Sequence, residues 1–235
     1  MEKKCYIALD FVTTEEAIDF LDLFHDDLPP VKIGMSLFYR GGLGFVEELC
    51  QKGYDIFLDL KSHDIPNTVY LGVSQLSQFP IDLLTVHALG GSDMIKAAVS
   101  GSKEAPYHPK ILAITQLTST TQEQLTNEQG INESLNDSVS RLAKLAYSAG
   151  ADGTVSAVDE VPRIKAVTEK NFLCVTPGIR FEGGAHQDQK RVATPAQAFK
   201  NGADHLVVGR PIIHSEDPVS SYHQVIKCLE GVDYK

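Results

Sequence analysis

The sequence predicts an α/β protein, a single-domain (β/α)8 TIM barrel over residues 1–235, and three observations favour this fold. Short runs rich in Ile, Leu and Val alternate with amphipathic stretches along the whole chain. The apolar runs recur about every 28 residues, which leaves room for one strand, one crossover helix and two short loops. Eight such units fit a chain of 235 residues, as a (β/α)8 barrel requires.

The expected strands lack strict alternation of apolar and polar residues, which is typical of parallel strands buried on both faces. They span residues 5–9, 31–35, 54–60, 83–87, 110–116, 153–157, 172–176 and 205–208. Periodicity cannot show whether a sheet closes, so a doubly wound open sheet is the alternative. That fold normally carries G-x-G-x-x-G after its first strand, and here Leu9-Asp10-Phe11-Val12 follows instead. The barrel is therefore favoured.

Helix signals lie between these strands. Thr13-x-x-Glu16 is a capping box that precedes an apolar stripe. A second stripe begins at Val139 and is ended by Gly150, and Gly53 similarly closes the helix before the third strand. These signals alternate with the strands, as the barrel requires.

Three further segments are expected to be loops. Residues 41–44, Gly-Gly-Leu-Gly, lack the Gly-Lys-Ser/Thr of a phosphate-binding P-loop and are typical of a turn. Residues 118–137 are polar and predict a surface insertion, in which Thr120-x-x-Glu123 is a candidate cap for a short extra helix. Residues 177–194 follow the seventh strand and are expected to form a lid over phosphate.

Composition excludes several classes of function. The formal net charge is −10 and the pI is near 5.2, so neither a nucleic-acid binder nor a membrane-surface binder is expected. No apolar run approaches the roughly 20 residues that span a bilayer, and no signal peptide is recognisable, so a cytoplasmic protein is expected. The cysteines are far apart and the histidines lack metal-binding spacing. No metal or cofactor is predicted, and a site built from His63, His87 and His205 is the weaker alternative.

Charged residues lie at the predicted carboxyl ends of neighbouring strands, where barrels place their functional residues. Asp10 follows the first strand, Lys32 lies in the second, and Asp59 and Lys61 end the third. Asp59 and Lys61 are two residues apart, so both face the same side of a strand. We therefore expect four charges to converge on the mouth of the barrel.

A lysine between carboxylates points to a particular kind of chemistry. Nearby negative charges favour the ammonium form, which is a poor nucleophile or Schiff-base former. The ammonium is a good proton donor and a good partner for a developing anion. The pattern indicates carbanion chemistry without a covalent intermediate, and it does not identify a substrate.

Phosphate binding is predicted on the other side of the mouth. Gly209 and Arg210 follow the last strand, where barrels often hold phosphate. Glycine allows the backbone to approach the phosphate, and arginine offers a bidentate charge. Arg180 and Gln189, both in the predicted lid, are expected to close over the same dianion.

The ten residues from Asp59 to Thr68, D-L-K-S-H-D-I-P-N-T, resemble the D-x-K-x-x-D-I-P-N-T signature of the orotidine 5′-phosphate decarboxylase family. The resemblance extends over nearly the whole chain, because shorter runs occur in the family's order at residues 8–10, 32–34, 116–119, 176–180 and 208–211. No departure is found at a position expected to be functional.

The resemblance implies a cofactor-free decarboxylation of orotidine 5′-monophosphate to uridine 5′-monophosphate, the last step of de novo pyrimidine synthesis. It implies that Lys61 donates a proton to the pyrimidine carbon that loses carbon dioxide, while Asp59 lies beside the scissile carboxylate. Lys32 and Asp64 would complete the charge array. It also implies a homodimer with shared active sites, to which each subunit lends Asp64 and Ile65. The implied substrate contacts are Asp10 and Lys32 with Thr68 at the ribose, Thr118 at the pyrimidine, Arg180, Gln189, Gly209 and Arg210 at the phosphate, and Pro177 in the lid.

Two alternatives remain at this point. Metal-dependent sugar-phosphate decarboxylases or synthases of the same barrel superfamily resemble this chain in a D-x-K-x-x-D strand. The continuation Ile-Pro-Asn-Thr at 65–68 and the lack of a carboxylate-rich metal shell speak against them. A catalytically silent nucleotide-binding barrel would be suggested by a missing charge among Asp59, Lys61 and Asp64, and all three are present.

Overall fold

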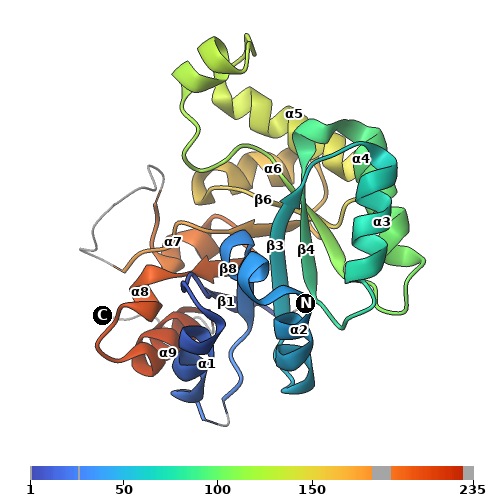
Figure 1. The fold of residues 1–235 in the computed structure, drawn as a ribbon. Coiled ribbons are helices and arrows are strands. Elements are labelled where there is room, and N and C mark those ends of the chain that lie inside the picture. Colours follow the sequence, from blue (N-terminus) through green and yellow to red (C-terminus); the bar gives the residue numbers. More distant parts are fainter. Residues whose placement is uncertain (1, 26, 182–191, 230–235) are drawn as a thin grey trace.

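The computed structural model describes residues 2–25, 27–181 and 192–229 and shows a closed barrel of eight parallel strands (Figure 1). The strands are β1 (Cys5–Ala8), β2 (Val31–Gly34), β3 (Ile56–Ser62), β4 (Leu83–His87), β5 (Lys110–Ile114), β6 (Gly153–Val155), β7 (Leu173–Thr176) and β8 (His205–Val208). Each strand pairs with the next in sequence, and β8 closes against β1 with Val208 opposite Ile7. The predicted barrel is confirmed, and the open doubly wound sheet is excluded.

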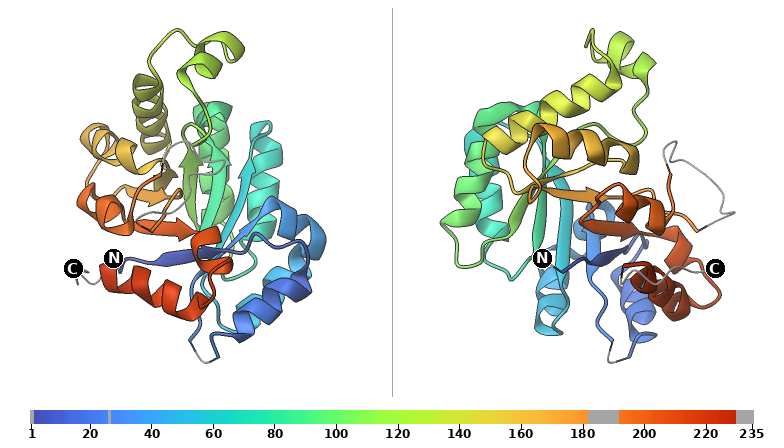
Figure 2. Two further views of the ribbon diagram at one scale, coloured as in Figure 1. Left: turned by 90° about the vertical axis from the view of Figure 1, so that its left-hand side faces the viewer. Right: turned by 180° about the vertical axis from the view of Figure 1, so that it is seen from behind.

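Helices surround the strands in all three ribbon views (Figures 1 and 2). They are α1 (Thr14–Asp22), α2 (Met35–Gln51), α3 (Pro66–Leu76), α4 (Gly91–Lys103), α5 (Leu135–Ser148), α6 (Val161–Val167), α7 (Pro195–Lys200), α8 (Arg210–Ile213) and α9 (Pro218–Leu229), with the short turns η1 (Ala88–Gly90), η2 (Gln124–Glu128) and η3 (Val158–Glu160). The capping box of α1 is present, because Thr13 Oγ1 accepts the Glu16 N–H at 3.2 Å and Glu16 Oε2 accepts the Thr13 N–H at 3.3 Å. Gly53 and Gly150 follow α2 and α5 with φ of 89°, as glycines that end helices do.

Two local predictions are wrong. Residues 41–44 do not form a turn but lie inside α2, where Gly42 alone leaves helical geometry with φ 60° and ψ −157°. The helix continues past this kink because its apolar face, including Phe45 and Leu49, is buried on the barrel. The extra helix is capped one residue later than predicted. Thr121 Oγ1 accepts the Gln124 N–H at 3.2 Å, and Gln124 Oε1 accepts the Thr121 N–H at 3.0 Å, since glutamine serves this position as well as glutamate.

Apolar side chains fill the barrel below its mouth. The inward-facing cluster consists of Tyr6, Ala8, Phe57, Leu83, Leu112, Leu173, Val175 and Val207. A larger cluster fills the layer between the strands and the helices. Close packing on both sides of the sheet leaves the strand ends little freedom, so side chains at the mouth stand on a rigid support.

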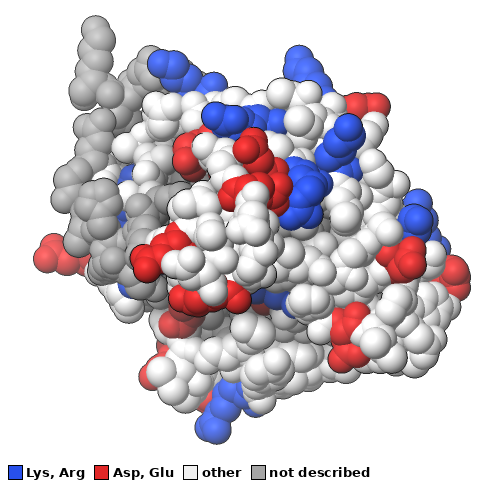
Figure 3. Space-filling model, turned by 90° about the horizontal axis from the view of Figure 1, so that it is seen from above, with Lys and Arg blue, Asp and Glu red and all other residues white. Residues whose placement is uncertain are grey.

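The charge of the molecule does not itself favour an anionic ligand. Basic side chains are interspersed with acidic ones on the face shown in Figure 3, and the formal net charge of the chain is −10. Attraction for an anion must therefore come from a local cluster of lysines and arginines. Within the described residues, no helix combines the length and apolar character needed to cross a membrane.

Candidate active site

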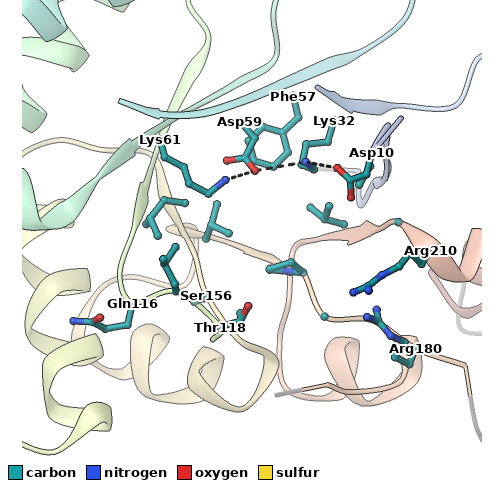
Figure 4. A pocket seen from close by; sticks show the side chains of 18 residues that line it. Asp10, Lys32, Phe57, Asp59, Lys61, Gln116, Thr118, Ser156, Arg180 and Arg210 are labelled. Atoms are coloured by element: carbon teal, nitrogen blue, oxygen red, sulfur yellow. Dashed lines mark hydrogen bonds and ion pairs between the residues drawn. The ribbon is translucent and has the colours of Figure 1, made fainter. Parts of the chain in front are cut away.

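A cavity of about 210 Å³ opens at the carboxyl ends of the strands (Figure 4). Ala8, Phe57 and Val207 belong to both the inward-facing apolar cluster and the cavity wall, so the cavity stands directly on the core. Nine of the predicted site residues line it: Asp10, Lys32, Asp59, Lys61, Thr118, Pro177, Arg180, Gly209 and Arg210. The barrel thus brings together residues that are up to 200 positions apart in the sequence.

Four charged side chains alternate in sign along one wall of the cavity, as Figure 4 shows. Lys32 Nζ lies 3.5 Å from Asp10 Oδ1 and 3.7 Å from Asp59 Oδ2. Lys61 Nζ lies 2.7 Å from the same Asp59 oxygen. Asp59 and Lys32 are buried, whereas Asp10 is more than half exposed. The predicted convergence of four charges is confirmed.

The backbone of β3 is irregular where it carries Asp59 and Lys61. Leu58 pairs with Leu84 of β4, but Ser62 pairs with Val86, so four steps along β3 match two along β4. Within this bulge Lys61 adopts φ of 54°, a left-handed conformation that is uncommon outside glycine. Bulges of this kind re-aim side chains near active sites, and here the bulge points the Lys61 ammonium at the carboxylate two residues earlier.

The opposite side of the cavity carries two guanidinium groups. Arg180 follows β7, Arg210 begins α8, and both side chains extend toward the same end of the cavity (Figure 4). Gly209 lies beside them, and a Cβ added there would lie 3.3 Å from Asp10 Oδ2 and 3.4 Å from Ala8 Cβ. Two cations beside a position that is tight for any side chain suit an anion with several oxygens, such as phosphate.

Only the two ends of the predicted lid belong to the described residues. They are joined, because Arg180 N–H donates to the Ala193 carbonyl at 2.9 Å and Ala193 N–H donates to the Gly178 carbonyl at 3.1 Å. Gln189 lies outside the described residues, as do residues 182–191 as a whole. The lid and its glutamine therefore stay predictions.

Three predicted residues lie away from the cavity within a single chain. Asp64, Ile65 and Thr68 are exposed on the loop after β3 and the first turn of α3. Asp64 Oδ1 accepts the Ile65 N–H at 2.7 Å and does not join the charged array of its own chain. Ile65 is 67 % exposed, which is unusual for a side chain of this size and apolarity.

The alternative histidine metal site is wrong. His63 and His87 stack with ring centroids 5.4 Å apart, but His205 begins β8 at the other end of the barrel. Among residues 2–25, 27–181 and 192–229, no group of three or more His, Cys, Asp or Glu side chains is placed to hold a metal ion. Burial, with His63 and Lys61 nearby, lowers the pKa of His87 to about 4. The His87 ring is therefore neutral at physiological pH.

Sequence reasoning missed Gln116 and Ser156, which line the cavity near Thr118 (Figure 4). Gln116 is buried, and its Nε2 donates to Ser138 Oγ on α5 at 3.2 Å. Ser156 directly follows β6, and its Oγ is buried with no hydrogen-bond partner among the described residues. The position of Ser156 directly after a strand was the signal that could have identified it. It was overlooked because the sixth strand end carries no charged residue.

Comparisons with known proteins agree with this geometry. Residues 3–225 match the family described as "Orotidine 5'-phosphate decarboxylase / HUMPS family". The chain is 46 % identical over 233 residues to orotidine 5′-phosphate decarboxylase of Fusobacterium nucleatum, covering 99 % of this chain and 98 % of that one. It is 49 % identical over 219 residues to the enzyme of the same name from Staphylococcus haemolyticus, covering 93 % and 95 %. The crystal structure of orotidine 5′-phosphate decarboxylase from Lactobacillus acidophilus superposes with a TM-score of 0.87 at 40 % identity, covering 97 % and 99 %.

Proposed function

This chain belongs to the orotidine 5′-phosphate decarboxylase family, and from that premise we propose how its residues convert orotidine 5′-monophosphate to uridine 5′-monophosphate and carbon dioxide. The reaction is a step of pyrimidine biosynthesis. The observation that supports the residue assignment best is the alternating array Asp10–Lys32–Asp59–Lys61, which faces two arginines across one cavity.

The two sides of the cavity fit the two ends of the substrate. The phosphate binds Arg180, Arg210 and the backbone at Gly209, and Gln189 joins them when the lid made by residues 177–194 closes. The ribose lies over Asp10 and Lys32. This arrangement carries the pyrimidine carboxylate toward Asp59 and Lys61, with Thr118 at the edge of the ring and Pro177 at the base of the lid.

The chemical step breaks the bond between the pyrimidine ring and its carboxylate. Carbon dioxide leaves, and the electron pair of the broken bond stays on the ring carbon. The Lys61 ammonium stabilises this negative charge and then delivers its proton to the carbon, which gives uridine 5′-monophosphate. No covalent intermediate is needed.

Electrostatic energies indicate how much of the rate enhancement the charged array can supply. A carboxylate about 4 Å from the Asp59 carboxylate is repelled by about 4 kcal/mol at an effective dielectric constant of 20. If the transition state releases all of it, the rate rises about a thousandfold. Enzymes commonly lower barriers by about 8–23 kcal/mol, so repulsion supplies only part of the effect. Stabilisation of the carbanion by Lys61 supplies more, with binding energy from the remote phosphate used to close the site.

A homodimer with shared active sites would explain the exposed loop after β3. Ile65, Met35, Leu89 and Leu117 are all exposed apolar residues that follow strands at the carboxyl end of the barrel. A second copy packed there would cover these side chains. It would also bring its Asp64 to Lys61 as the next charge of alternating sign and its Ile65 and Thr68 to the substrate.

The cellular location stays a prediction. The thiols of Cys5, Cys50 and Cys174 are free, which agrees with a reducing compartment such as the cytoplasm.

An ultraviolet assay of substrate loss, run with and without a strong chelator, tests the proposal. We expect rapid conversion to uridine 5′-monophosphate that is insensitive to the chelator, because the proposed steps use only side chains of the chain itself. Loss of activity on chelation would favour a metal-dependent sugar-phosphate type of mechanism. Binding of the nucleotide by folded protein without turnover would favour a silent barrel.

A further inference from the structure

Thr85, in the middle of β4, contacts Asp59 and Lys61 of β3 but does not itself line the cavity. We propose that Thr85 is a positioning residue for the decarboxylation: its hydroxyl fixes the Asp59 carboxylate and the left-handed Lys61 backbone at the same time. The inference rests on the proposed function, because it assigns a role in that reaction.

One hydroxyl group serves both contacts. Thr85 is fully buried. Its Oγ1 accepts the Lys61 backbone N–H at 2.8 Å and donates to Asp59 Oδ1 at 3.0 Å. A hydroxyl has one proton to donate and lone pairs to accept with, so the two bonds are compatible.

The contact to Lys61 supports an unfavourable backbone. Regular pairing of β3 with β4 is interrupted between Leu58 and Ser62, and Lys61 has φ of 54° within this stretch. A left-handed conformation outside glycine persists only where surrounding contacts hold it. The hydrogen bond from the Lys61 N–H to a side chain on the neighbouring strand is such a contact, and it keeps the ammonium aimed into the cavity.

The contact to Asp59 sets which carboxylate oxygen meets the lysines. With Oδ1 bound to Thr85, Oδ2 faces both cations, at 2.7 Å from Lys61 Nζ and 3.7 Å from Lys32 Nζ. Without the hydroxyl, rotation of the carboxylate and relaxation of the Lys61 backbone would both become easier. Misplacement of catalytic groups by about 1 Å can lower a rate by about a hundredfold.

Two substitutions at Thr85 separate its hydroxyl from its shape. Thr85→Val removes the hydroxyl and keeps the branched side chain, whereas Thr85→Ser keeps the hydroxyl and removes a methyl group. Thr115→Val is the matched control, because Thr115 is equally buried, follows β5, does not line the cavity, and its hydroxyl has no partner among the described residues.

We expect Thr85→Val to lower kcat by about 10- to 100-fold with KM changed less than about threefold, since the phosphate and ribose contacts lie elsewhere. Thr85→Ser should stay within about threefold of the unmodified enzyme in kcat, and so should Thr115→Val. Circular dichroism and thermal melting establish that each variant is folded. If Thr85→Val does not fold, Thr85→Ser and Thr85→Ala provide the same comparison.

The inference is overturned if folded Thr85→Val keeps the kcat of the unmodified enzyme. It is also overturned if Thr85→Ser loses as much as Thr85→Val, because packing of the methyl group would then be the cause. An inactive unmodified enzyme would instead contradict the proposed function, so the two failures are distinguishable.

Discussion

The ammonium of Lys61 lies 2.7 Å from the Asp59 carboxylate, and the left-handed backbone of Lys61 is what turns it there. In a regular strand, side chains two residues apart stand side by side and perpendicular to the sheet. The φ of 54° at Lys61 instead directs one side chain across the other at the rim of the cavity. The proposed proton donor is thereby held beside Asp59, the carboxylate proposed to lie next to the carboxylate of the substrate.

We expect Lys61→Ala to lower kcat by at least about a thousandfold. General acid catalysis alone commonly contributes about 10²- to 10⁴-fold, and the variant also loses the charge that stabilises the carbanion. The loss of orotidine 5′-monophosphate absorbance measures the effect. Lys96→Ala, at an exposed lysine of α4, serves as the control and should be fully active. Near-normal turnover by Lys61→Ala would exclude Lys61 as the proton donor.

The variant Asp59→Asn tests whether Asp59 acts by repelling the substrate carboxylate or by binding the substrate. The amide keeps the shape of the carboxylate and removes its charge, so the substrate carboxylate is no longer repelled. We expect kcat to fall by about 10²- to 10³-fold, in line with about 4 kcal/mol of lost repulsion at most, and KM to fall or stay unchanged. Steady-state kinetics give both constants. A raised KM with an unchanged kcat would make Asp59 a binding group only.

The path of the barrel could be predicted from the sequence because it depends on patterns that are local. Strand spacing, capping residues and helix-ending glycines each leave a mark within a few positions, and residues at strand ends then meet by topology alone. Asp10, Lys32, Asp59 and Arg210 were found in this way. The ten-residue run that begins at Asp59 then predicted the reaction, through its resemblance to the family signature.

The features that were missed depend on tertiary contacts. The bulge at Lys61 has no sequence signal, because a lysine gives no sign of a left-handed backbone. Thr85 looks like any other small residue in a buried strand, and its role appears only once Asp59 and Lys61 lie across from it. Residues 41–44 resembled a turn because the helix propensity of their three glycines is low, whereas burial of Phe45 beyond them keeps α2 helical on both sides of the kink at Gly42.

We expect Arg210→Ala to weaken substrate binding more than it slows the chemical step. Hydrogen bonds to charged groups contribute about 1.5–3 kcal/mol, so KM should rise by about 10- to 100-fold. Single-turnover measurement at saturating substrate reports the chemical step separately, and we expect it to change much less. Arg163→Ala, at an exposed arginine of α6, is the control. An equal fall in kcat and kcat/KM, with KM unchanged, would instead show that the phosphate contact acts mainly in the transition state.

Mixing two inactive variants tests the shared active site. Lys61→Ala removes the proposed proton donor, and Asp64→Ala removes the charge that each subunit is proposed to lend to its neighbour. A mixed dimer would contain one site with both defects and one intact site. After random exchange of subunits between equal amounts of the two variants, half of the dimers are mixed. Each mixed dimer has one intact site out of two, so activity should return to about a quarter of that of the unmodified enzyme. No recovery after verified exchange would place Asp64 in the active site of its own chain, or outside it.

His205 should make the stability of the fold fall as the pH is lowered. The ring is almost fully buried at the amino end of β8, and its Nδ1 accepts the Lys4 backbone N–H at 3.0 Å. Burial lowers the pKa of His205 to about 4; Lys4 and Lys110 act in the same direction, and Asp204 opposes them. Between about pH 6.5 and pH 4 the unfolded chain binds a proton that the folded chain does not, so acidification through this range favours unfolding.

The variant His205→Asn isolates this effect, because the asparagine Oδ1 can accept the same N–H and does not titrate. Urea unfolding at pH 7.5 and pH 5.0 gives the free energy of unfolding for each protein. We expect the loss of stability on acidification to be about 2 kcal/mol smaller in the variant. This follows because the pKa of His205 is about 4 in the folded protein and about 6.5 in the unfolded chain. His87 also has a lowered pKa, but it is present in both proteins and cancels in the comparison. Equal losses in the two proteins would mean that His205 titrates in the folded state as it does in the unfolded chain, and that its ring is open to water.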